Sequence, residues 1–130
     1  MKRRTIENLL RQLIAAFAAS GDPWPSAAQL RQLLPVLAKE TINSQRRIAV
    51  LRDLRALLED RMGSLGETIS CLETGVYPIG RGKLDESSVA SLRSRFASLG
   101  RQLETEVSAE LARQTEEKQH ARRRKRRERK

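Results

Sequence analysis

The chain has 130 residues, the usual size of one domain, and 38% of them are hydrophobic. Its single cysteine excludes an internal disulfide, and no apolar run approaches the ~20 residues that cross a bilayer. We therefore expect an intracellular protein without integral membrane association: cytoplasmic or nucleoid-associated, or nuclear in a eukaryote.

The formal net charge of +10 lies at the two ends of the chain. Residues 5–117 hold 14 basic and 15 acidic residues, and Lys2, Arg3 and Arg4 precede them. From Lys118 onward there are nine basic residues and one glutamate. A basic DNA-binding face would carry this charge on the folded surface, so the pattern favours a cationic tail. Arginine outnumbers lysine 20 to 6, which favours bidentate contacts with phosphate or carboxylate.

The first predicted helix covers residues 5–20, with Thr5 as its cap, and Gly21 and Pro23 end it. Trp24, between two prolines, is expected to pack over the end of the bundle. The apolar residues of the helix recur at steps of three or four, which predicts one buried face. They are Ile6, Leu9, Leu10, Leu13, Ile14 and Phe17.

A second helix is predicted over 26–38, opened by a capping box of Ser26 and Gln29 and ended or kinked by Pro35. A third is predicted over 40–61, with bends at Gly63 and Gly66 and an apolar face that continues toward Glu73. Its apolar residues are Ile48, Leu51, Leu54, Leu58, Met62, Ile69 and Leu72.

Residues 74–83, T-G-V-Y-P-I-G-R-G-K, form the one clear linker, because they hold three glycines and a proline. Gly75 and Gly80 have the spacing of a P-loop, but the following lysine and a preceding strand are missing. We therefore interpret this segment as a connection, with Arg81 and Lys83 as secondary phosphate contacts at most.

The last predicted helix covers residues 84–119 and is capped by Asp85. We expect it to extend beyond the bundle from about residue 103, so that three of its apolar residues dock a partner helix or a second copy. A dimer is therefore expected. The stripe comprises Val89, Leu92, Phe96, Leu99 and the docking residues Leu103, Val107 and Leu111.

Together these elements predict an all-α fold, a small antiparallel bundle of three to four helices. Residues 1–83 form its N-terminal part, residues 84–119 a long amphipathic helix that packs on it, and residues 120–130 a disordered polybasic tail.

The tail is the principal candidate site. Its basic side chains are expected to neutralise backbone phosphates and to gain affinity by counterion release, without reading sequence. The contacts expected are Arg122, Arg123, Arg124, Lys125, Arg126, Arg127, Arg129 and Lys130, helped by Lys2, Arg3 and Arg4.

A second set of nucleic-acid contacts follows if residues 26–38 and 40–62 form a helix-turn-helix. The arginines concerned are Arg46, Arg47, Arg52 and Arg55. In the alternative interpretation they form a solvent face balanced by acidic neighbours, with Arg55 paired to Glu59 one turn away.

No enzyme, metal site or cofactor is expected, because Cys71 has no thiol partner and His120, the sole histidine, is far along the chain. No motif places the chain in a known family. The sequence favours a non-enzymatic accessory protein associated with nucleic acid, and the scarcity of aromatic residues favours duplex DNA slightly over RNA. The alternative is an adaptor that docks another protein through its long helix.

Overall fold

The computed structural model describes residues 5–20, 24–41, 44–59, 62–80 and 83–128, with side chains at all of these except 26 and 115–128. Over these residues the protein is all-helical and has no strand, as predicted. The helices are α1 (Thr5–Ser20), α2 (Pro25–Lys39), α3 (Gln45–Leu57), α4 (Leu65–Thr74) and α5 (Glu86–Glu128). None of them is long and apolar enough to span a membrane within the described ranges.

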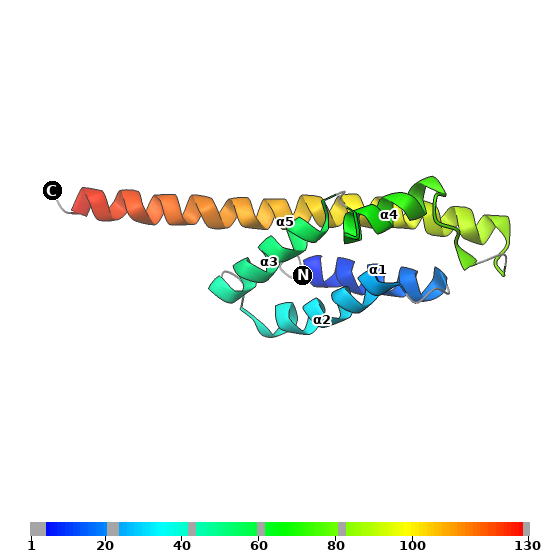
Figure 1. Ribbon diagram of the computed structural model, residues 1–130. Coiled ribbons are helices and arrows are strands. Elements are labelled where there is room, and N and C mark those ends of the chain that lie inside the picture. Colours follow the sequence, from blue (N-terminus) through cyan, green and yellow to red (C-terminus); the bar gives the residue numbers. More distant parts are fainter. Residues whose placement is uncertain (1–4, 21–23, 42–43, 60–61, 81–82, 129–130) are drawn as a thin grey trace.

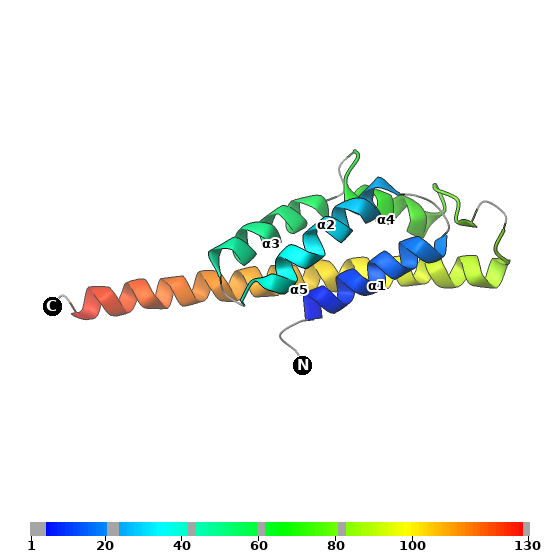
Figure 2. The same ribbon diagram turned by 90° about the horizontal axis from the view of Figure 1, so that it is seen from below.

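The long helix α5 is the element on which the bundle is built. It has 43 residues, which corresponds to a length of about 65 Å at ~1.5 Å per residue. Helices α1, α3 and α4 pack against it and run antiparallel to it, while α2 packs on α1 and α3 (Figures 1 and 2). The C-terminal end of α5 continues past the other helices (Figure 1).

The core consists of the apolar stripes of all five helices. Phe17 of α1 and Phe96 of α5 meet within this core, with ring centroids 5.0 Å apart and planes inclined at 53°. Such a tilted pair is a favourable aromatic geometry. Several leucines contributed by all five helices are fully buried around the pair, among them Leu10, Leu30, Leu51, Leu72 and Leu103. The apolar spacing of α1 predicted both the helix and its buried face.

The predicted third helix is wrong in its extent, because the chain forms two helices there. Gly63 takes a left-handed φ of 80°, which is costly for other residues. Ser64 then caps α4 by accepting from the Glu67 N–H at 3.1 Å, and Glu67 accepts in turn from the Gly63 N–H at 2.9 Å. Helix α3 begins later than predicted, at Gln45, because Ser44 caps it by accepting from the Arg47 N–H.

Helix α2 also differs from its prediction at both ends. It begins at Pro25, so that Ser26 lies inside the first turn and is not the cap. Proline suits this position, since the first-turn N–H groups have no helical partner in any case. Pro35 lies within the helix and does not end it. The helix continues to Lys39 because Leu37, beyond the proline, is fully buried in the core.

The connections at one end of the bundle are packed against each other. Trp24 stacks on Tyr77 of the loop after α4, with ring centroids 5.3 Å apart, and its Nε1 donates to Ser20 Oγ. Gly75 caps α4 in the left-handed conformation. Asp85 then caps α5, as predicted, by accepting from the Ser88 N–H at 2.8 Å. Hydrogen bonds donated by the side chain and the backbone N–H of Ser88 lower the pKa of the Asp85 carboxyl.

The end of α5 differs from the expectation of a helix to residue 119 and a disordered tail. The helical backbone continues to Glu128. Arginine, lysine, glutamate, glutamine and alanine are all good helix formers, and residues 115–128 consist almost entirely of them. This composition favours a helical backbone over these residues.

Candidate nucleic-acid interface

The principal candidate site lies at the end of α5 beyond the bundle. Residues 122–127 belong to this helix by their backbone, and the described side chains end at Gln114. Lys2, Arg3, Arg4, Arg129 and Lys130, which were also predicted to contact nucleic acid, lie outside the described residues. The six consecutive basic residues 122–127 span more than one helical turn of 3.6 residues, so their backbone positions are distributed all around the helix axis.

The arginines of α3 do not form the common face that a helix-turn-helix requires. Arg46 is 74% exposed and lies 3.5 Å from a Glu40 carboxylate oxygen. Arg47, its neighbour, is completely buried. The expectation that Arg47 contacts nucleic acid is therefore wrong.

Arg47 instead connects its own helix, α3, to three others inside the bundle. Its Nε and Nη2 donate to the Glu110 carboxylate of α5 at 2.7 and 3.1 Å, and Nη2 also donates to Glu7 of α1 at 3.0 Å. Nη1 donates to the Leu37 carbonyl at 3.3 Å. Burial alone would lower the pKa of Arg47, but the hydrogen bonds and charges of Glu110 and Glu7 outweigh it and raise the pKa. We call Arg47, Glu7 and Glu110 the buried ion cluster.

The sequence did contain a signal for this cluster. Arg47 lies four residues before Leu51 and seven before Leu54, and so belongs to the apolar stripe of α3. Glu7 and Glu110 likewise occupy positions on the apolar stripes of α1 and α5. A charged residue in such a position is rarely buried unless it is paired.

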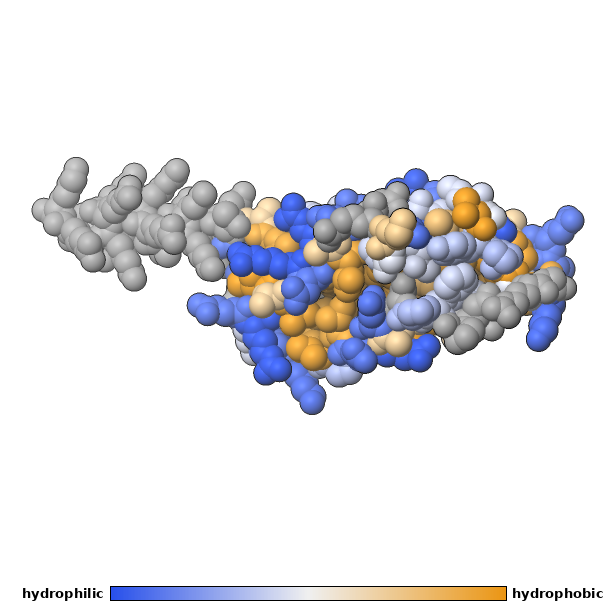
Figure 3. Space-filling model, in the orientation of Figure 1, coloured by the Kyte–Doolittle hydropathy of each residue, from blue (hydrophilic) through white to orange (hydrophobic). Residues whose placement is uncertain are grey.

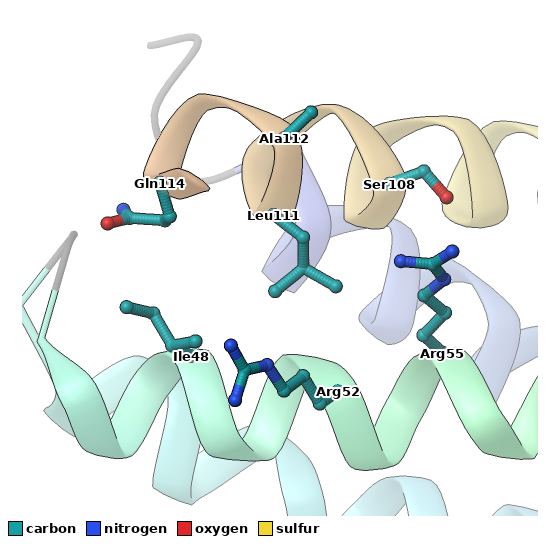
Figure 4. A pocket seen from close by; sticks show the side chains of 7 residues that line it. All are labelled: Ile48, Arg52, Arg55, Ser108, Leu111, Ala112 and Gln114. Carbon is teal, nitrogen blue, oxygen red and sulfur yellow. The ribbon is translucent and has the colours of Figure 1, made fainter. Parts of the chain in front are cut away.

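Arg52 and Arg55 are exposed and follow Ile48 by four and seven residues, on a side of α3 that borders α5. They border a hollow of about 390 Å³ between α3 and α5. Figure 4 shows the Arg55 guanidinium extending toward α5, the Arg52 side chain lying along α3, and Leu111 pointing down from α5 to α3. The residues that line the hollow are Ile48, Arg52, Arg55, Ser108, Leu111, Ala112 and Gln114.

The three residues predicted to dock a partner are not available for that role. Leu103 and Val107 are fully buried and Leu111 is 7% exposed, all within the core of the chain itself. The prediction was wrong because it placed the overhang from residue 103 onward, whereas α5 still has buried residues as far as Gln114. The described surface is instead mixed, with apolar side chains gathered in the middle of one face and hydrophilic ones around them (Figure 3).

The described residues offer no group of three or more histidine, cysteine or acidic side chains that could hold a metal ion. Cys71 is free and half-buried. The linker glycine Gly75 serves as the cap of α4, and Lys83 is exposed, while Arg81 lies outside the described residues.

Comparisons with protein-family models, with curated proteins and with solved structures found no match for this chain.

Proposed function

We propose that the protein is a non-enzymatic accessory protein that binds the phosphate backbone of nucleic acid through the basic end of α5. The observation that carries the proposal is the location of the charge. Residues 5–117 are nearly neutral, whereas the segment from Lys118 onward holds nine basic residues and one glutamate. This segment belongs largely to the part of α5 that continues beyond the bundle.

Basic positions all around the helix axis mean that this segment can meet a phosphate backbone whichever side faces the nucleic acid. Binding of this kind releases condensed counterions and depends little on base sequence. The bundle then serves as a folded base from which the helix projects. Duplex DNA is the preferred partner in this proposal, since contact with backbone phosphates requires no aromatic platform.

The test is a salt titration of binding to a labelled duplex of random sequence, using the full chain. In the test variant, Arg122, Arg123, Arg126 and Arg127 become glutamine, which retains good helix propensity. In a matched control, the exposed residues Arg31, Lys39, Arg95 and Arg101 become glutamine. Both variants lose four positive charges.

We expect the wild type to bind with a steep dependence on salt, and the test variant to lose up to about 3.6 from the slope of log K against log salt. The control should change the slope much less, because its residues lie away from the end of α5. Equal slopes for the two variants would show that net charge alone governs binding. Absence of binding by the wild type would reject the proposal in favour of a protein-docking role.

A further inference from the structure

The residues that line the hollow between α3 and α5 suit a ligand that has both an anionic group and an apolar part. Its interior is apolar, since Ile48 and Leu111 are 6% and 7% exposed and lie between the two helices. Its border is cationic, with Arg52 and Arg55 on one side, and Ser108 adds a hydroxyl on the other.

The two arginines are free to bind a ligand. Within the described residues, neither guanidinium makes a hydrogen bond or salt bridge, and the pair expected between Arg55 and Glu59 does not form. Arg46 and Arg47 on the same helix are both paired with carboxylates. Binding an anion at Arg52 and Arg55 therefore requires no existing ion pair to be broken.

The spacing of the arginines suits a phosphate group. Residues three apart on a helix have Cβ atoms about 5–6 Å from each other. The two side chains leave α3 in different directions (Figure 4), but both are exposed, so rotation about their side-chain bonds can bring both guanidinium groups to one anion. Each guanidinium presents a planar fork of donors that matches phosphate oxygens. A hollow of about 390 Å³ is within the range of small-molecule sites. It is large enough for a sugar beside the phosphate.

The hollow also lies on the path to the basic end of α5. From Leu111 to Arg122 the axial rise is about 16 Å at ~1.5 Å per residue. One strand of a duplex places a phosphate about every 3.4 Å along its axis, so about five phosphates span that distance. A duplex that contacts the basic end can therefore reach the hollow.

We propose that the hollow binds one phosphodiester group of the same nucleic acid that the basic end of α5 holds. The phosphate lies between Arg52 and Arg55, and the adjoining sugar packs its C–H face against Ile48 and Leu111. This inference rests on the proposed function. It adds a defined contact on the rigid bundle, which fixes where the nucleic acid lies relative to α3.

The experiment uses the full chain and a random 20-base-pair duplex. Arg52→Gln/Arg55→Gln is compared with Arg31→Gln/Arg95→Gln, which removes the same charge from exposed positions elsewhere. Binding is measured against salt. In parallel, backbone amide shifts of Ser108 and Ala112 are followed by NMR during titration with the duplex.

We expect the Arg52/Arg55 variant to bind about fivefold more weakly than the control variant, with a salt slope smaller by about one. The duplex should shift the two amides in the wild type but not in this variant. Identical binding by the two variants, or no shift at Ser108 and Ala112 while the duplex binds, would overturn the inference and leave the proposed function intact.

Two further measurements separate the proposals. If the glutamine variant at residues 122, 123, 126 and 127 still binds the duplex through Arg52 and Arg55, the hollow is supported and the basic end is rejected. A titration with a deoxynucleoside monophosphate alone tests the source of the phosphate. If it shifts the two amides and the duplex does not bind at all, the ligand is a free nucleotide and the strand contact is wrong.

Discussion

Replacing Arg47 with alanine leaves the carboxylates of Glu7 and Glu110 buried without the guanidinium that contacts both. Glu7 is 1% exposed and Glu110 is 6% exposed, so water cannot readily take the place of the lost charge. Removing one partner of a buried ion pair costs about 3–5 kcal/mol. Against a typical total of about 5–15 kcal/mol, Arg47→Ala should remove a fifth or more of the stability.

The neighbouring residue provides a matched control. Arg46→Ala removes the same side chain from a position that is 74% exposed and pairs with Glu40 at 3.5 Å. An exposed pair of this kind contributes only about 0–1 kcal/mol. Urea unfolding followed by far-UV circular dichroism gives both free energies, provided that the slope against urea is unchanged. Equal losses of unfolding free energy in Arg47→Ala and Arg46→Ala would refute the reasoning.

The cause of the stability loss in Arg47→Ala can be tested separately. In the triple variant Arg47→Met, Glu7→Leu, Glu110→Leu, apolar groups of similar size replace all three charges. Such replacements are often neutral or stabilising. We expect the triple variant to be clearly more stable than Arg47→Ala. A triple variant as unstable as Arg47→Ala would mean that lost packing, and not unpaired charge, explains the effect.

Three other substitutions, and a fourth that serves as a control, test the fold. Gly66→Ala should destabilise by about 1–3 kcal/mol, because its Cβ would collide with the carbonyl oxygen of Leu58; a smaller loss would mean that α4 moves readily. Leu103→Ala should cost about 2–5 kcal/mol without changing the oligomeric state by light scattering, while Met62→Ala, at a 96% exposed position, should change stability little. Asp85→Ala should lower stability at neutral pH. The pKa of Asp85 in the folded protein lies below its ordinary value of 3.8. The difference in unfolding free energy between variant and wild type should therefore persist above pH 3.8 and shrink as the pH falls through the folded pKa. A difference that does not depend on pH would argue against the cap.

The sequence predicted the helices whose ends carry strong local signals. The bounds of α1 follow from its periodic apolar residues and the glycine and proline after it, and Asp85 marks the start of α5. The division between α3 and α4 was missed because apolar residues continue at helical steps across it. The available signal was Ser64 followed three residues later by Glu67, which is a capping-box pattern.

The buried ion cluster shows what local patterns do not reveal. Arg47 is 40 residues from Glu7 and 63 from Glu110 in the sequence. Nothing near Arg47 distinguishes it from Arg46, except that it falls in line with the leucines of its helix. Its partners become apparent only once three helices are brought together. The hollow beside Arg52 and Arg55 has the same origin, since four of its seven lining residues come from α5.

Because α5 is one continuous helix, it also fixes the orientation of its basic end relative to the bundle. Glu110 is held by Arg47, and the helix continues without interruption from there to Glu128. Each residue turns the helix by about 100°, so one residue inserted after Gln114 would swing everything beyond it through about that angle. Seven inserted residues, about two turns, would nearly restore the original orientation and move the end outward by ~10 Å. The number of residues between the bundle and the basic end thus determines the rotational phase of that end as well as its reach.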